Sequence, residues 1–308
     1  NDQKVAARAA VNRLAGSRRL LCHAVFAPGQ PGWLDEIDRA VAQLRPEAWK
    51  GYTIGDPTSP SRFPWRLDDE KLVYPAYEKM VKAGITTVCI HKGILPPNAE
   101  QAFPGGLWQY GKVDDVGKAA KDWPQLNFVI YHAGYRPLPN PSPQDVQRFE
   151  QTGYLEWVSA LAEIPAKHGV RNVYAEVGAA FALTCVTHPR DCAGLMGTLI
   201  KGLGTDHVLW GTDSVWFGSP QWQIEALRRL EIPEELQKKF GYAPLGPADG
   251  MVKNAIFGLN AARLYKLQLR SSKGPDAYRD KLAELKADYE KGGADRSNAV
   301  YGFIAKRA

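Results

Sequence analysis

The stretch LNFVIYHAG, residues 126–134, runs from apolar side chains into a histidine and a glycine. A hydrophobic run of this length bounded by Gly is typical of a buried parallel strand, and His132 stands at its carboxyl end. Two other stretches share the pattern: ITTVCIHKG at 85–93 ends near His91, and HVLWGTDSVWFG at 207–218 carries Asp213 after its apolar run. Barrel enzymes place their chemistry at the carboxyl ends of parallel strands, so these three residues predict an active site.

Apolar runs alternate with helical patterns along most of the chain. Three further runs read as strands, at 19–29, 49–56 and 172–180. Segments with apolar residues every three or four positions separate the runs and predict helices at 31–47, 74–84, 113–125, 155–169, 192–204, 219–233 and 251–267. Strands that alternate with helices imply crossover connections, so the sequence predicts an α/β fold with six parallel strands.

Composition places the chain among globular proteins, and a small-molecule substrate is the expected partner. Its 308 residues are 44% hydrophobic and 23% charged, which is enough for one large α/β domain. The net charge of +6 is dispersed and is not interleaved with aromatic residues, so we expect no nucleic acid partner. No apolar run reaches the length of a membrane span, so no membrane partner is expected. The mild basic excess is interpreted first as a solvated basic surface, with an anionic substrate such as a carboxylate as the alternative.

The order of the motifs resembles a known family. A strand ending in His, a strand ending in HAG and a strand ending in GTD are followed by NAIFGLNAARLYKL at 254–267. This order is similar to the amidohydrolase-related branch of the metal-dependent amidohydrolase superfamily, over residues 1–267. The resemblance implies a (β/α)8 TIM barrel, of which about six strands are present here. It implies a barrel domain at 1–267 and leaves a C-terminal helical extension at 268–308.

The front of the barrel departs from the family pattern. Members carry an H-x-H or E-x-H pair on the first strand, and this sequence lacks it. Two strands are missing, and we expect six strands to leave two exposed parallel edges. A preceding segment of the protein or another polypeptide is expected to supply the rest, and a homo-oligomer is expected. A cytoplasmic location is favoured, with export as the alternative if an N-terminal segment has been removed.

The resemblance implies one divalent metal ion, zinc before manganese. His91 would be a metal ligand, and Asp213 would bind the ion and act as general base and then acid. His132 would be catalytic, polarising the substrate or exchanging a proton with it. Each residue has a structural alternative: a strand-end His that is only capped, and an Asp213 that serves as N-cap or Asx-turn residue.

Substrate contacts are expected from loops that follow the same strands. Tyr135 and Arg136 follow His132, and Arg136 suits a carboxylate because guanidinium pairs with it in bidentate fashion. Trp216 would form an aromatic wall, and Glu176 would line the pocket or support a ligand. Loop packing is the alternative for the loop residues.

Two inner-strand residues receive weaker predictions. Lys50 is expected to precede the body of its strand, so a role in bridging two metals is not favoured. His23 is expected to be a buried structural histidine.

Three functions remain open at this level. The favoured one is hydrolysis of a C–N or C–O bond by a metal-bound hydroxide. The runner-up is non-oxidative decarboxylation of an aromatic or enoic acid, which this branch also performs. The third is a non-catalytic subunit that lacks the metal-binding pair.

Overall fold

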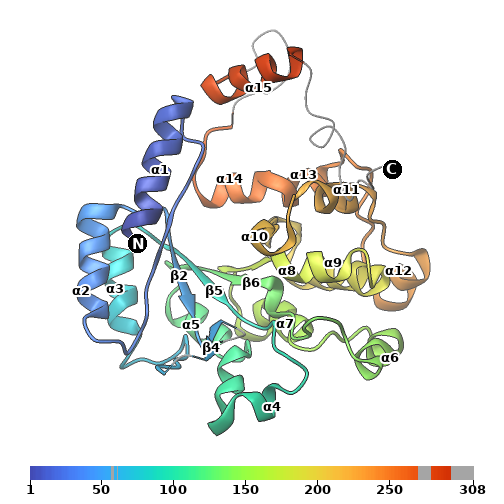
Figure 1. Ribbon diagram of the computed structural model, residues 1–308. Helices are drawn as coiled ribbons and strands as arrows, with labels where there is room; N and C mark the ends of the chain where they lie inside the picture. Colours follow the sequence, from blue (N-terminus) through green and yellow to red (C-terminus); the bar gives the residue numbers. More distant parts are fainter. Residues whose placement is uncertain (57–58, 61, 270–278, 293–308) are drawn as a thin grey trace, which may run out of the picture.

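Parallel strands form the centre of the protein, and Figure 1 shows helices arranged around them. The computed structural model describes residues 1–56, 59–60, 62–269 and 279–292. Its main sheet has six parallel strands in chain order: β1 (His23–Val25), β2 (Ala48–Tyr52), β5 (Thr87–His91), β6 (Asn127–Tyr131), β7 (Val173–Glu176) and β8 (Val208–Leu209). A separate antiparallel pair joins β3 (Gly55–Asp56) to β4 (Ser59–Pro60). The predicted α/β fold with six parallel strands is confirmed.

Helices follow the strands as the spacing of apolar residues predicts. Those associated with the strand crossovers and the loops around them are α2 (Trp33–Arg39), α3 (Tyr74–Lys82), α4 (Ala99–Ala102), α5 (Val116–Asp122), α6 (Pro143–Thr152), α7 (Val158–His168), α8 (Gly178–Thr184) and α9 (Pro189–Leu203). Those after β8 are α10 (Ser214–Phe217), α11 (Gln221–Arg229), α12 (Glu234–Phe240), α13 (Met251–Asn254) and α14 (Asn260–Leu264). The chain begins with α1 (Asp2–Ala15), and α15 covers Lys281–Lys291.

The two faces of the sheet bury different residues because side chains alternate along each strand. One face carries the main apolar core with the crossover helices, for example Trp49, Ile90 and Phe128. The opposite, inner face carries a small cluster of buried residues: Ala48, Cys89, Val129 and Leu209. The inner face also holds the polar strand-end residues, so it is the face of a barrel interior.

The C-terminal end of α14 packs against this inner face. Leu264 and Tyr265 contact the small apolar cluster, and the Tyr265 hydroxyl lies 3.0 Å from Nε2 of His23. The Tyr131 hydroxyl lies 3.5 Å from Nδ1 of the same imidazole. His23 is therefore half-buried on the inner face, with a tyrosine hydroxyl near each ring nitrogen.

The sheet is open, as expected, because β1 and β8 each pair with a strand on one side only. Side-chain amides nevertheless contact both edge strands. The side-chain amide of Asn1 accepts from the Val25 N–H at 2.8 Å and donates to the Val25 carbonyl at 3.1 Å. At the other edge, Asn260 donates to the Val208 carbonyl at 2.8 Å, and the Trp210 N–H donates to the Ile256 carbonyl. A side-chain amide offers the same donor and acceptor as a backbone peptide, so each contact satisfies individual backbone groups of an edge strand.

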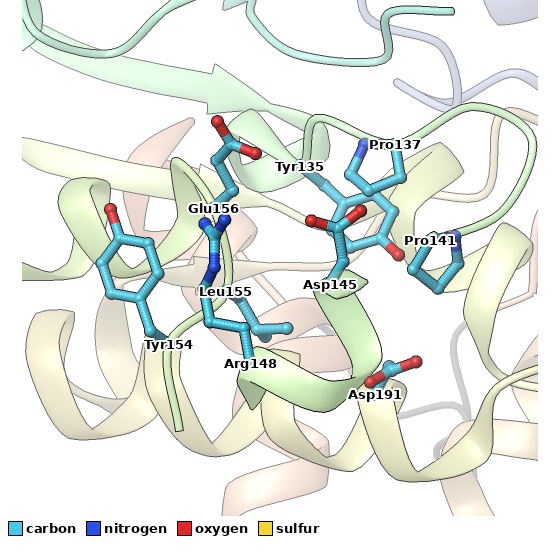
Figure 2. Close-up of a pocket in the computed structure, with 9 residues that line it drawn as sticks. All are labelled: Tyr135, Pro137, Pro141, Asp145, Arg148, Tyr154, Leu155, Glu156 and Asp191. Atoms are coloured by element: carbon cyan, nitrogen blue, oxygen red, sulfur yellow. The ribbon is translucent and has the colours of Figure 1, made fainter. Parts of the chain in front are cut away.

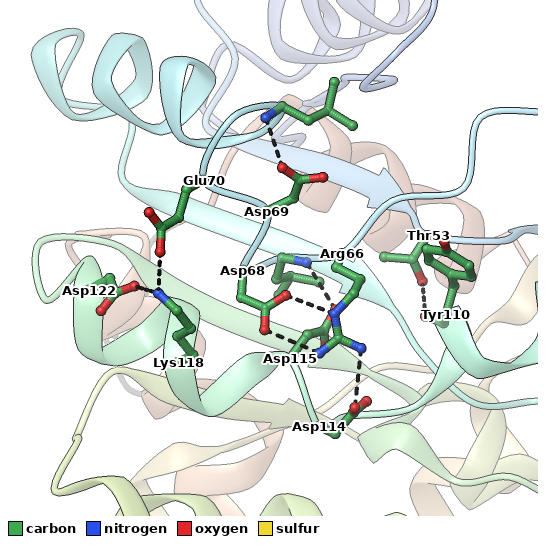
Figure 3. Close-up of polar contacts among 12 residues, drawn as sticks. Thr53, Arg66, Asp68, Asp69, Glu70, Tyr110, Asp114, Asp115, Lys118 and Asp122 are labelled. Atoms are coloured by element: carbon green, nitrogen blue, oxygen red, sulfur yellow. Dashed lines mark hydrogen bonds and ion pairs between the residues drawn. The ribbon is translucent and has the colours of Figure 1, made fainter.

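Ion pairs hold the Pro-rich loop after β2 against α5, as Figure 3 shows. Arg66 pairs with Asp68 at 2.9 Å and with Asp114 at 3.1 Å, and Lys118 pairs with Glu70 at 2.8 Å. Beneath them, Asp115 accepts from the Leu67 N–H at 2.9 Å. These contacts hold residues 66–70 against α5 and the turn that precedes it.

Much of the predicted C-terminal extension, at 270–278 and 293–308, lies outside the described residues. In the described part of this extension, Asp280 caps the start of α15 and accepts two hydrogen bonds from Arg19. The division at residue 267 stays a prediction. None of the helices in the described part of the chain is long and apolar enough to cross a membrane.

Candidate active site

His91 and His132 meet at the carboxyl edge of the sheet. His91 ends β5 and His132 follows β6, and these strands pair in register from Thr87 with Asn127 to His91 with Tyr131. The pairing brings His132 Nε2 to 3.2 Å from His91 Nδ1. Two residues that are far apart in sequence thus form one hydrogen-bonded pair.

Backbone geometry selects the neutral form of His132. The Ala179 N–H, in the first turn of α8, donates to His132 Nδ1 at 3.2 Å, so this nitrogen carries a lone pair. The proton must then lie on Nε2, which donates to His91. Burial is the largest cause that lowers the pKa of His132 well below 6.5, and the nearby His91 and Lys50 act in the same direction.

Glu176 lies beneath His132 and is fixed by two backbone groups. Its Oε2 accepts from the His132 N–H at 3.2 Å, and its Oε1 accepts from the Gly178 N–H at 2.9 Å. Burial, followed by the charge of Asp213, raises the pKa of Glu176 to about 7. A Cβ on Gly211 would lie 1.4 Å from Glu176 Oε1, so the glycine of the GTD motif makes room for this carboxylate.

Of the two carboxylates near His132, that of Asp213 is the more exposed to solvent. Its side chain is 30% exposed, against 5% for His132, and its Oδ2 lies 3.5 Å from His132 Nδ1. Burial raises the pKa of Asp213 above 3.8, while the charge of Lys50 lowers it. Asp213 precedes α10, but its side chain accepts no hydrogen bond from the first turn of this helix. The structural alternative, in which the Asp213 side chain caps the helix, is therefore not supported.

The structure brings His91, His132, Glu176 and Asp213 together, and it gives Arg136 carboxylate partners outside this group. The Arg136 guanidinium pairs with Glu100 at 2.7 Å and with Glu156 at 3.9 Å. Trp216 is 81% exposed on α10. Their roles as substrate contacts stay predictions, and Arg136 would first have to leave its carboxylate partner.

Tyr135 points into a separate pocket, which Figure 2 shows in close-up. The pocket is lined by residues of the loop after β6, of α6 and its flanking loops, and of α9: Tyr135, Pro137, Pro141, Asp145, Arg148, Tyr154, Leu155, Glu156 and Asp191. Tyr135 is 2% exposed. The chain turns sharply between β6 and this residue, because His132 and Ala133 have φ values of 59° and 52°.

Lys50 lies on the inner face of the sheet, a position that the sequence analysis did not predict. It lies within β2, which begins at Ala48, and not before the strand body as expected. Its register position is opposite Cys89, on the face that carries Tyr52 and His91. Ala48, Lys50 and Tyr52 are spaced two residues apart and so lie on one face of the strand. This alternation could have predicted that Lys50 lies on the inner face.

His23 gives a testable dependence of stability on pH. Burial, followed by the charge of Lys50, lowers the pKa of His23 from 6.5 to about 4. Between pH 6.5 and pH 4, His23 is protonated in the unfolded chain but stays neutral in the folded protein. The free energy of unfolding should therefore fall as the pH drops through this range. The loss is at most about 3 kcal/mol, at roughly 1.4 kcal/mol per pKa unit. Urea unfolding at pH 7.5 and 5.0 measures it.

His23→Gln should show less of this pH dependence, because glutamine can still bond to Tyr265 but does not titrate. His188→Gln, at a histidine near the surface, serves as the control and should behave like the wild-type protein. Equal pH dependence in His23→Gln and the wild-type protein would contradict the assignment.

The donors at this edge do not complete a metal site. Imidazole and carboxylate suit zinc, but catalytic zinc sites have three protein ligands, and the predicted set here is His91 and Asp213. In the described residues, no group of three or more His, Cys, Asp or Glu side chains is arranged to hold an ion. His91 Nδ1 faces His132 instead. The predicted divalent ion therefore stays a prediction.

Solved structures share the fold. The 5-carboxyvanillate decarboxylase of Sphingomonas paucimobilis aligns with a TM-score of 0.50 and 20% identity, over 87% of this chain and 71% of that one. A 2,6-dihydroxybenzoate decarboxylase aligns with a TM-score of 0.49 and 15% identity, over 86% of this chain and 76% of that one. An amidohydrolase of Burkholderia multivorans aligns with a TM-score of 0.47 and 14% identity, over 82% of this chain and 76% of that one. At such identities the likeness concerns the fold alone. No curated protein matches the chain significantly.

A family model described as amidohydrolase matches residues 5–267. The match spans all six strands and ends after α14. It includes the strand ends that carry His91, His132 and Asp213. The chain belongs to the amidohydrolase family.

Proposed function

We propose that this protein hydrolyses a C–N or C–O bond of a small anionic substrate. The observation that carries the proposal is the placement of Asp213, a carboxylate open to solvent, 3.5 Å from the buried imidazole of His132. A general base must be reachable by water and must lie within hydrogen-bond distance of the proton that it takes. The Asp213 carboxylate is 30% exposed, so a water molecule can reach it.

The reaction follows from these positions. Asp213 takes a proton from a water molecule as the water oxygen attacks the carbonyl carbon of the substrate. Asp213 keeps this proton until the tetrahedral species breaks down. When the C–N or C–O bond breaks, Asp213 returns the proton to the leaving nitrogen or oxygen. The Ala179 N–H and His91 hold the neutral His132 ring in a fixed orientation beside Asp213.

Decarboxylation is supported less by the same geometry. Loss of carbon dioxide leaves a carbanion that needs a proton from an acid. His132 Nδ1 already accepts the Ala179 N–H, so a second proton on this ring would have to displace that bond. Glu176 is held by two backbone N–H groups and is 8% exposed, which limits its reach to a substrate.

A substrate panel separates the candidate functions. The purified protein is incubated with N-acyl amino acids and with lactones that carry a carboxylate, and acid release is followed by a pH indicator. Dihydroxybenzoates are tested in parallel for release of carbon dioxide. We expect hydrolysis of at least one anionic amide or lactone. Release of carbon dioxide, or no turnover of any compound in the panel, would contradict the proposal.

The divalent ion predicted from the family resemblance is tested separately. Elemental analysis of the same preparation measures zinc and manganese per chain. About one equivalent supports the prediction, and less than about a tenth of an equivalent contradicts it. Assays with and without added zinc then show whether turnover depends on the ion.

A further inference from the structure

Lys50 places a positive charge inside the sheet beside the candidate active site. The residue is 8% exposed, and its Nζ lies 3.3 Å from the centroid of the Tyr131 ring and 4.9 Å from that of Tyr52. Tyr52 stacks on His91, with ring centroids 5.6 Å apart. The ammonium group therefore lies one strand position below the histidine pair, between two aromatic rings.

No carboxylate of the described residues forms an ion pair with Lys50. The two nearby candidates, Glu176 and Asp213, attract it only through longer-range charge interactions. Glu176 is already bound by two backbone N–H groups, and Asp213 faces His132. Contact with aromatic faces compensates only part of the cost of burying an ammonium group. A buried cation in this situation is suited to pair with an anion that enters the site.

The charge persists at neutral pH. Burial lowers the pKa of Lys50 to about 8, and the charges of Cys89, Glu176 and Asp213 oppose the shift. Most of the lysine is therefore protonated at pH 7. The flanking tyrosines add two apolar surfaces on which a planar group attached to the anion can pack.

We propose that Lys50 binds the carboxylate group of the substrate and thereby positions the bond to be cleaved near Asp213. The inference deepens the proposed function and rests on it for the reaction, but the binding itself can be measured without turnover. A carboxylate held by this ammonium stays on the molecule throughout hydrolysis. The substrate class is therefore a small carboxylic acid that also carries an amide or ester bond.

Binding of two probes of matched shape tests the charge. Benzoate and benzamide share size and planarity, but only benzoate is an anion. We expect isothermal titration calorimetry to show benzoate bound at least tenfold more tightly than benzamide. In Lys50→Met the affinity for benzoate should fall at least tenfold, and that for benzamide should change less than threefold. Lys50→Arg, which restores a cation, should recover part of the preference for benzoate.

Lys112→Met is the matched control. Lys112 also lies over an aromatic ring, with Nζ 4.5 Å from the Trp108 centroid, but it is outside the histidine cluster. Its removal changes the net charge by the same amount, so it should leave the affinity for benzoate within twofold of the wild-type value. An equal loss in both variants would overturn the proposal, because it would show an effect of net charge alone.

A second measurement uses the wild-type protein and so does not depend on the folding of a variant. Reductive methylation of lysines is followed by mass spectrometry with and without saturating probe. Benzoate should slow the modification of Lys50 at least fivefold, whereas benzamide should not, and Lys112 should react equally in all samples. Unchanged labelling of Lys50 in benzoate would overturn the proposal. Protection of Lys50 without hydrolysis of any substrate would support the anion site and count against the proposed reaction alone.

Discussion

Asp213→Asn is expected to lower turnover of a hydrolysed substrate by about 10²- to 10⁴-fold, the usual contribution of a general base. Asparagine has nearly the same shape but cannot accept the proton of the attacking water. The variant should keep the fold, because Asp213 has a φ of 46° and asparagine tolerates this left-handed conformation almost as well as aspartate. Steady-state kinetics with a substrate found in the panel measures the loss.

The split between binding and turnover distinguishes a catalytic from a structural role. Asp213→Asn should bind benzoate within a few-fold of the wild-type affinity, while its kcat falls. Asp206→Asn is the matched control, since Asp206 precedes the same strand and its side chain is 61% exposed beside His207. It should keep full turnover. Normal kcat in Asp213→Asn would remove Asp213 from the mechanism.

The strand ends of the fold could be predicted from sequence because a buried parallel strand leaves a continuous apolar run. His91 and His132 each follow such a run, and in-register pairing of β5 with β6 places them in contact. The contact also depends on this register and on the left-handed backbone at His132, which redirects the chain after β6. Roles as ligand or catalyst do not follow from the pairing and stay predictions.

The loop residues could not be predicted because their positions depend on distant partners. Arg136 follows His132 closely in sequence, yet it pairs with Glu100 and Glu156 from other segments. The chain turns sharply before Tyr135, through the left-handed backbone at His132 and Ala133. The residues next to Arg136 and Tyr135 in the sequence indicate neither the carboxylates that pair with Arg136 nor the turn that precedes Tyr135.

The edges of the sheet show the same limit. Six strands of a barrel suggest two unsatisfied edges, but Asn1 and Asn260 each supply a side-chain amide to an edge strand. Nothing in the local pattern around either asparagine indicates a partner across the fold. Such contacts depend on the packing of elements that are distant in sequence, here α14 against β8.

Asp115→Ala is expected to destabilise the protein by about 3–5 kcal/mol, the usual cost of leaving one member of a buried ion pair alone. The Lys92 and Asp115 side chains are 0% and 1% exposed, and Nζ lies 2.8 Å from Oδ2. The same oxygen accepts the Leu67 N–H, so the substitution also leaves a buried backbone donor without its acceptor. Urea unfolding followed by circular dichroism measures the difference.

Neighbouring Asp114 offers a control of the same residue type. Its side chain is 58% exposed and pairs with Arg66 at 3.1 Å, so Asp114→Ala should cost less than about 1 kcal/mol. Similar losses in the two variants would contradict the role assigned to burial. The double variant Lys92→Met/Asp115→Ala should be more stable than Asp115→Ala, because methionine brings no charge into the core.

Dependence on pH gives the sharpest check of the cause. Burial is the largest influence on both groups, lowering the pKa of Lys92 and raising that of Asp115. Without Asp115, the folded protein favours neutral Lys92 still more strongly, while the unfolded chain keeps the lysine protonated up to its ordinary pKa of about 10.4. The free energy of unfolding of Asp115→Ala should therefore rise with pH as that value is approached, and the double variant should lack this rise.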